Sequence, residues 1–402
     1  MANKTRSFVH TLNRPIVVLL LLQLMGGIML APYLGFFPIY VKELGYSAIV
    51  ISVIVAAKRV AGLAASLLGG TWSDTLGRKR TLLFGNIGFL LAGLVFFTPR
   101  PEVIGVLWAL SGFGMGLHTL GGQSYLLDAA DPDYLGLFSA LFNWGYTLGG
   151  ALSGPIVGFL LEQWGYGALG TALFVFALAT IVINQMALPK SSVAGKKVTA
   201  EKLFGYGSVA TRPPVLMLSA LRFLPTFYYG MSLILVPLLL DEAGADKIII
   251  AVYTTVSQVA ASLGQVIVGR AADRFGPKWP TVVTFSTLVV SIFGIGAWPG
   301  RLWRVLGFGA LGMAAAWSLS TLLPSLVAEA TAPQERGRAL GWIHLWWNLA
   351  MIVGAMTGGA LFQVRRWLPF IVSGVLNVPS ILLVFVFYRQ VSAWRATGQT
   401  QR

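Results

Sequence analysis

The sequence predicts an all-α integral membrane protein with twelve transmembrane helices in two pseudo-symmetric six-helix bundles. Its composition is the first reason, because 56% of the 402 residues are hydrophobic and only 11% are charged. The mean hydropathy is +0.75, which excludes an ordinary water-soluble globule. A membrane-spanning helix needs roughly 20 mostly apolar residues, so the chain has room for about twelve spans and short loops.

Apolar runs between charged, proline or glycine breaks give the expected helices in order. The first run is too long for a signal-peptide core and lacks a small-residue cleavage site, so we expect a span there. We expect one bundle at residues 1–188, a cytoplasmic linker at 189–213 and a second bundle at 214–402. The expected spans are 15–41, 47–69, 81–98, 103–127, 136–160, 167–188, 214–239, 248–268, 281–298, 304–327, 338–362 and 367–388.

The two halves of the sequence repeat each other. GGTWSDTLGRK, which contains Asp74, matches VGRAADRFGPK, which contains Asp273, at an offset of 199 residues. Asp128 matches Glu329 at an offset of 201, and GALSGP matches GAMTGG at an offset of 204. Halves repeated in the same orientation predict a pseudo-twofold axis along the membrane normal, with a binding site between them near the midplane.

The excess of basic residues, 29 Lys and Arg against 14 Asp and Glu, follows the positive-inside rule. Most lie in alternate short segments, such as Arg78, Lys79, Arg80 and Arg274, and this places both termini in the cytoplasm. We therefore expect a multi-pass protein of the cell (inner or plasma) membrane. The expected partners are the lipid bilayer and a small molecule, with no nucleic acid, and we expect a monomer.

The sequence contains no motif that indicates an enzyme. The chain has no cysteine, which excludes thiolate metal sites. It also lacks an H-E-x-x-H pair and the phosphate-binding pattern G-x-x-x-x-G-K-[ST]. We expect no catalytic residues, no metal and no cofactor.

A loop motif between the second and third expected spans identifies a family. Gly70, Asp74, Gly77, Arg78 and Lys79 resemble the signature G-x-x-x-D-x-x-G-R-K of the major facilitator superfamily, and with the repeat the resemblance covers essentially the whole chain. It implies secondary active transport by alternating access. It also implies a conformational latch, in which Asp74 meets a helix start and a loop cation pairs with Asp128. The expected latch residues are Gly70, Asp74, Gly77, Arg78, Lys79, Asp128, Asp273 and Glu329.

A second motif bears on the direction of transport. Gly150-x-x-x-Gly154-Pro155-x-x-Gly158 resembles the antiporter motif of the superfamily's drug and metabolite exporters, which implies export. The arginine that proton-coupled members carry in the fourth span is absent, because Trp108 and Leu110 precede a G-x-G-x-G run there.

Three cations fall inside expected spans: Lys58, Arg59 and Arg222. An ionisable group at bilayer depth costs several kcal/mol unless it is paired or lines a cavity, and every carboxylate maps to a loop or span end. These cations predict an electropositive cavity for a phosphate or carboxylate. We expect His118 and His344 to couple protons. The aromatic residues expected to bind substrate are Tyr33, Phe37, Tyr125, Tyr228, Trp317 and Trp346.

The expected function is proton-coupled efflux of an amphipathic organic compound. The alternative is a carrier or exchanger of an anionic or zwitterionic substrate, with a phosphate, carboxylate or lipid-like group bound by the intramembrane cations. An alternative of another class is a non-transporting membrane receptor or scaffold.

Overall fold

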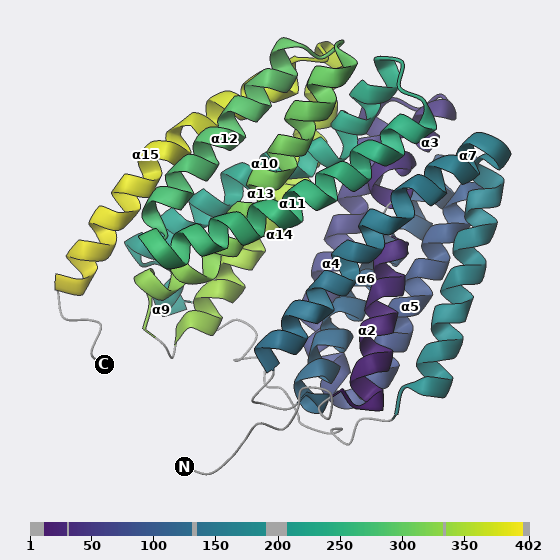
Figure 1. Ribbon diagram of the computed structural model, residues 1–402, viewed down its shortest axis with the longest axis horizontal. Helices are drawn as coiled ribbons and strands as arrows, with labels where there is room; N and C mark the ends of the chain where they lie inside the picture. Colours follow the sequence, from purple (N-terminus) through teal and green to yellow (C-terminus); the bar gives the residue numbers. More distant parts are fainter. Residues whose placement is uncertain (1–11, 30–31, 131–134, 190–206, 333–334, 397–402) are drawn as a thin grey trace. The chain divides into compact units, whose positions relative to one another are not determined.

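The computed structural model describes residues 12–29, 32–130, 135–189, 207–332 and 335–396. Every regular element in these residues is a helix (Figure 1). The elements are α2 (Arg14–Ile28), η1 (Pro32–Phe36), α3 (Phe37–Glu43), α4 (Ala48–Leu76), α5 (Arg78–Leu94), η2 (Val95–Phe97), α6 (Pro101–Ala129), α7 (Leu135–Ala187), α9 (Gly207–Ala210), α10 (Pro213–Glu242), α11 (Lys247–Phe275), α12 (Lys278–Ala297), α13 (Leu302–Ala330), α14 (Arg336–Val364) and α15 (Leu368–Ala396).

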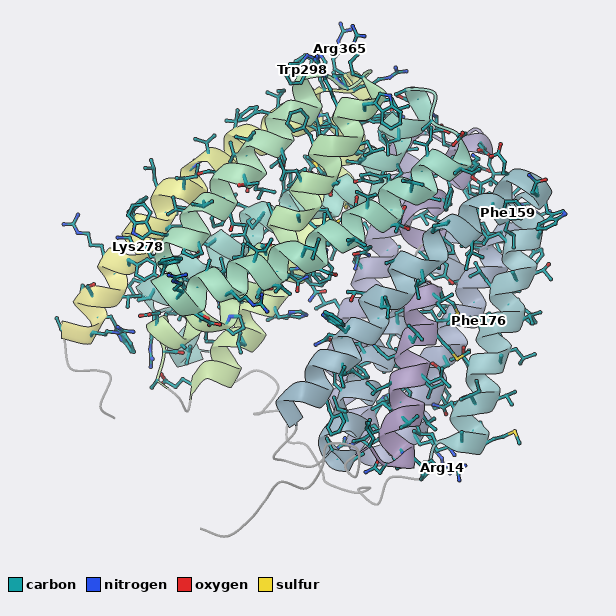
Figure 2. The ribbon with its side chains drawn as sticks, viewed as in Figure 1. Arg14, Phe159, Phe176, Lys278, Trp298 and Arg365 are labelled. Carbon is teal, nitrogen blue, oxygen red and sulfur yellow. The ribbon has the colours of Figure 1, made fainter. Side chains whose placement is uncertain are left out.

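Ten of the helices in this part of the chain are long and apolar enough to cross a membrane. One of them, α7, has 53 residues, a length of about 80 Å that exceeds twice the thickness of a bilayer core. Gly165, at φ 70° and ψ −171°, divides α7 into two helices. Apolar side chains cover the outer surfaces, as Phe159 does on α7, where it is 53% exposed (Figure 2). These are the features of a multi-pass membrane protein.

The first span differs from the single helix expected over residues 15–41. Helix α2 ends at Ile28, and a π-helical turn, η1, leads into the short α3. Proline removes a backbone donor from a helix, and Pro32 and Pro38 stand at the starts of η1 and α3. The apolar run concealed this change because hydropathy carries no information on backbone hydrogen bonding.

The chain forms two compact units. Unit 1 comprises Met1–Tyr33 and Ala57–Thr199, and unit 2 comprises Leu34–Ala56 and Ala200–Arg402. Helix α4 therefore begins in unit 2 and ends in unit 1. The sequence analysis did not foresee this exchange, and its bundles at 1–188 and 214–402 stay a prediction. Of the expected linker, residues 190–206 lie outside the described residues.

Each unit brings two helices together through glycines. In unit 1, a Cβ added to Gly27 of α2 would overlap the Tyr146 carbonyl of α7, and one added to Gly149 would overlap the Leu24 carbonyl of α2. Unit 2 repeats the arrangement, because Gly354 of α14 lies equally close to the Phe227 carbonyl of α10. Small residues allow such approach where lipid offers no hydrophobic drive between helices.

The turns after corresponding helices also repeat. Gly45 and Gly244 have φ angles of 90° and 86°, and Gly77 and Gly276 have 90° and 75°. Both pairs stand at an offset of 199 residues. Positive φ strains residues with a Cβ, which explains glycine at all four positions.

Candidate functional site

Lys58 of α4, a predicted site cation of unit 1, lies against two aromatic rings. Its Nζ lies 3.7 Å from the ring centre of Trp108 and 4.8 Å from that of Tyr33, and the two rings meet edge to face at 5.2 Å. No carboxylate of the described residues pairs with Lys58. Aromatic faces attract a cation but supply no negative charge, so Lys58 has no counter-ion among the described residues. Arg59 follows in the chain, half-buried, with its Nε out of contact with water.

The G-x-G-x-G run of α6 explains why α4 can approach so closely. A Cβ added to Gly112 would overlap the Lys58 carbonyl, one on Gly114 would lie 2.5 Å from the Gly88 Cα of α5, and one on Gly116 would lie 2.7 Å from Ala65. Each glycine removes a side chain that would push α6 away. The run therefore has a structural reason, namely the close contact of three helices beside Lys58.

Arg222 of α10 is the predicted site cation of unit 2. Its Nη1 donates to the Ser320 hydroxyl at 2.7 Å, and the guanidinium carbon lies 5.9 Å from the Trp347 ring centre. The buried Nε has no hydrogen-bond partner among the residues that the structure describes, and no carboxylate there pairs with Arg222. Like Lys58, Arg222 lies near an aromatic ring, and it has one neutral hydrogen-bond acceptor in addition.

His118 lies in the interior of unit 1, only 2% exposed. Its Nδ1 is 2.9 Å from Oδ1 of Asn86 and its Nε2 is 3.1 Å from Oε1 of Gln23. A neutral imidazole carries one N–H, so one amide must present its NH₂ group, or the ring must hold two protons. The hydrogen bonds of this buried site therefore depend on the tautomer of His118. Its predicted role in proton coupling stays a prediction.

The aromatic residues predicted to bind substrate fall into two groups. Trp317 meets Tyr229 at 6.0 Å and Trp346 meets Phe223 at 6.0 Å, so both belong to the aromatic surroundings of α10 in unit 2. His344 stacks on Trp347, the ring over which Arg222 lies, at 5.0 Å. Of the other four, Tyr33 lies beside Lys58, Phe37 and Tyr228 are buried, and Tyr125 donates its hydroxyl to the Pro189 carbonyl at 3.1 Å.

Comparison with known proteins now fixes the family, because residues 19–239 and 218–401 both match the model for the Major Facilitator Superfamily. The chain belongs to the major facilitator superfamily. As a major facilitator it is a secondary transporter, not an enzyme, and it moves a small molecule.

Several relatives of this major facilitator span most of its length. It is 24% identical to a gallate transporter of Pseudomonas putida, covering 92% of this chain and 91% of the relative. It is 23% identical to a gentisate transporter of Corynebacterium glutamicum, covering 83% and 78%, and 22% identical to the quinolone resistance protein NorA of Staphylococcus aureus, covering 87% and 90%. A crystal structure of a bacterial homologue of the human lysosomal transporter Spinster is similar in fold, with a TM-score of 0.78, 12% identity and coverage of 97% and 99%.

Part of the major facilitator signature forms contacts in unit 1. Nε of Arg78 lies 3.0 Å from Oδ2 of Asp128, the expected pair, whereas Lys79 donates to the Gln185 carbonyl at 2.7 Å. Gly77 begins α5 with positive φ. The positions of Gly70 and the Asp74 side chain lie outside what the structure describes, so the latch stays a prediction.

The second copy of the signature uses a different partner. Glu329 is the counterpart of Asp128, and its Oε2 pairs at 2.5 Å with Arg395 of α15. Lys278, one residue from the missing arginine, lies instead 5.1 Å from the Phe385 ring and 5.7 Å from the Tyr388 ring. Asp273 is exposed at the end of α11.

The antiporter-like motif lies on a packed face of α7. Gly150, Gly154 and Gly158 are buried, whereas Pro155 is exposed. The closest helix contact falls one residue earlier, at Gly149. The motif thus borders the α2–α7 contact, which is the close packing expected from small residues, and its relation to direction stays a prediction.

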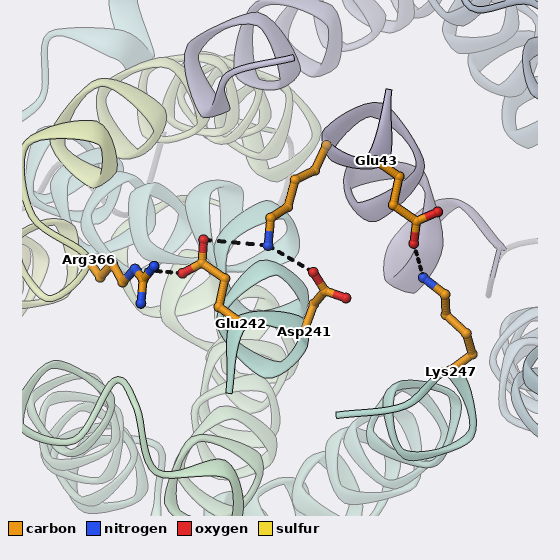
Figure 3. Close-up of polar contacts among 6 residues, drawn as sticks. Glu43, Asp241, Glu242, Lys247 and Arg366 are labelled. Carbon is orange, nitrogen blue, oxygen red and sulfur yellow. Dashed lines mark hydrogen bonds and ion pairs between the residues drawn. The ribbon is translucent and has the colours of Figure 1, made fainter. Parts of the chain in front are cut away.

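A charged network in unit 2 was missed by the sequence analysis (Figure 3). Lys42 pairs with Asp241 at 2.8 Å and with Glu242 at 3.5 Å, Arg366 pairs with Glu242 at 2.7 Å, and Lys247 pairs with Glu43. A signal was present, since KELG after the first span matches DEAG at an offset of 199 residues. The network ties α3 to α10, α11 and the turn before α15.

Proposed function

We propose that this major facilitator carries organic anions with an aromatic or other apolar body, and that Lys58, Arg59 and Arg222 contact the anionic group. The observation that carries the proposal is the state of Lys58 and Arg222, which have aromatic neighbours but no carboxylate among the described residues. Lys58 and Arg222 are half-buried, and a cation held away from water without a counter-ion is unfavourable inside a membrane. An entering anion supplies that counter-ion, which gives the substrate a reason to bind.

The chemistry of two relatives supports this substrate class. Gallate and gentisate, which name the transporters similar to this chain, are hydroxylated aromatic carboxylates. Trp347 beside Arg222 is half-buried and offers a stacking partner for an aromatic substrate, and the guanidinium of Arg222 offers parallel donors for a carboxylate. This is the anionic alternative of the sequence analysis, which we now place first.

We infer that the chain crosses the membrane twelve times. Ten helices qualify by length and composition, α7 supplies two spans because Gly165 divides it, and α2, η1 and α3 together supply the broken first span. With the positive-inside distribution this gives cytoplasmic termini and two six-span bundles working by alternating access. The expected monomer stays a prediction.

The test is counterflow of labelled 3,4,5-trihydroxybenzoate in proteoliposomes. We expect saturable flux in the parent protein and at least a tenfold loss of kcat/KM in Lys58→Gln and Arg222→Gln, because each removes a charge. Lys278→Gln is the matched control, since Lys278 also lies near aromatic rings but at a helix start. Equal effects in all three variants, or no flux of any organic anion, would rule the proposal out.

The second candidate is proton-coupled efflux of an amphipathic compound. The antiporter-like motif in α7 and the similarity to NorA, named for quinolone resistance, favour export, and His118 and His344 would hold the proton. Flux of a lipophilic dye from everted vesicles, with and without a pH gradient, tests it. A gradient-driven dye flux that trihydroxybenzoate does not inhibit would favour this candidate over the first.

A further inference from the structure

A small hollow inside unit 2 is not explained by either cation. Its cavity volume is about 20 Å³, which is enough for one water-sized group, and it lies between α10, α11 and α13. None of its lining side chains is charged. They are Ser232, Leu233, Pro237, Tyr253, Thr254, Ser257, Gln258 and Met313.

Gln258 is the group in this lining that calls for a ligand. Its side chain is 5% exposed, and its amide has no hydrogen-bond partner among the described residues. The neighbouring hydroxyls differ, because Thr254 donates to the Ile250 carbonyl and Ser232 to the Tyr229 carbonyl, both at 3.0 Å. The Ser257 hydroxyl oxygen beside it is fully buried and has no hydrogen-bond partner among the described residues, whereas the Gln258 amide keeps some accessible surface. A guest that bonds to both groups gains hydrogen bonds that the protein does not supply.

Another glutamine of α11 shows what a partnered amide looks like in the same helix. Gln265 accepts a hydrogen bond from the Thr321 hydroxyl of α13 at 3.3 Å. Gln265 lies two turns from Gln258 and outside the hollow. The two residues therefore share a helix and a chemical type, and differ in whether the amide faces a protein partner or empty space.

The wall of the hollow touches the unusual backbone of η1. A Cβ on Gly35 would lie 2.7 Å from the Thr254 hydroxyl oxygen, so the glycine lets this π-helical turn approach α11. Single π-helical turns occur frequently at functional sites. The contact connects the hollow to the segment Leu34–Ala56, which includes Lys42 and Glu43.

We propose that this hollow is the subsite for a hydroxyl group on the uncharged part of the substrate, with Gln258 as its specificity-determining residue. The assignment rests on the proposed function, whose cations take the charged group. A phenolic or alcoholic hydroxyl donates to the amide oxygen or accepts from its NH₂. A carboxylate would lose its water there without gaining a counter-ion. A site built to bond a hydroxyl strongly rejects the analogue that lacks it.

The test measures binding of three probes to purified protein in detergent by calorimetry. The probes are 3,4,5-trihydroxybenzoate, benzoate, and 1,2,3-trihydroxybenzene, which has the hydroxyls but no carboxylate. We expect the parent protein to prefer trihydroxybenzoate to benzoate by at least tenfold. Gln258→Leu should abolish that preference while leaving benzoate affinity within twofold, and Ser257→Ala should reduce the preference severalfold. Gln265→Leu is the matched control and should leave all affinities within twofold.

The outcomes separate the two claims. Loss of affinity for trihydroxybenzoate and benzoate alike in Gln258→Leu, or no change in either, overturns the subsite. A parent protein that binds trihydroxybenzene as tightly as trihydroxybenzoate, in a Gln258-dependent way, upholds the subsite and overturns the anion proposal. Absence of Gln258-dependent binding of all three probes overturns the subsite as well. Size-exclusion profiles matching the parent protein confirm that each variant is folded.

Discussion

Lys42 and Asp241 occupy equivalent positions of the sequence repeat, 199 residues apart, and form an ion pair of 2.8 Å. Pro38 and Pro237 precede them at the same offset, and Gly45 and Gly244 follow with positive φ. Two copies of one helix end thus carry opposite charges where they meet. The pair holds the end of α3 against α10 within unit 2.

We expect this pair to be coupled energetically but weakly. The two side chains are 33% and 24% exposed, and such pairs contribute up to about 1 kcal/mol. Lys42→Asp and Asp241→Lys should each lower the apparent Tm, and the double variant should recover most of the loss. A double-mutant cycle of thermal unfolding measures the coupling. Additive losses in the double variant would show that the two charges act independently.

The glycine contact between α2 and α7 should resist even one added carbon. Gly149→Ala places a Cβ against the Leu24 carbonyl, which cannot move without shifting α2, so we expect destabilisation of about 1–3 kcal/mol. Gly167→Ala is the control, because nothing lies within 4 Å of its added Cβ, and alanine there should be neutral or stabilising by up to about 1 kcal/mol. Thermal unfolding in detergent compares them, and equal effects would contradict the packing argument.

We expect substitution of His118 to reduce proton coupling while leaving substrate exchange intact. If the ring between Asn86 and Gln23 holds the transported proton, His118→Gln keeps counterflow, which needs no gradient, and loses accumulation driven by a pH gradient. Proteoliposomes measure both quantities on one preparation. His344→Gln, altered at the exposed histidine that stacks on Trp347, tests the second candidate in the same way. Accumulation unchanged in both variants would leave the histidines with a structural role.

We expect the Trp108 indole to support anion binding by holding the Lys58 ammonium group in position. The 3.7 Å contact is an attraction worth about 2 kcal/mol when desolvated. Trp108→Leu should therefore weaken trihydroxybenzoate binding by about tenfold, and Trp108→Phe, which keeps a ring face, by less. Calorimetric titration measures both affinities. Equal losses in the two variants would assign the indole a packing role only.

Hydropathy and the repeat predicted the helical fold because a helix exposed to lipid needs a mostly apolar composition along its whole length. Lys58 and Arg222 stood out for the same reason, since charge within an apolar run is conspicuous. The pairing of Lys42 with Asp241 was not visible, because charges at span ends are ordinary and their partners depend on which helix ends meet.

The finer features escaped for other physical reasons. The π-helical η1 differs from its surroundings only in backbone hydrogen bonding, which side-chain periodicity does not report. Gln258 is a polar residue in a helix of moderate polarity, and its sequence neighbours do not distinguish it from Gln265. The two amides differ because the Thr321 hydroxyl of α13 bonds to Gln265. Only the folded structure reveals this contact.

Helix α4 changes unit between Ala56 and Ala57, one residue before Lys58. Helix α4 begins shortly after Glu43 of the charged network and continues unbroken past Lys58. The backbone of Lys58 is therefore part of the helix that carries the chain from unit 2 into unit 1. In the proposed function, the helix that presents the cation to the anionic group is also the one that joins the two units covalently.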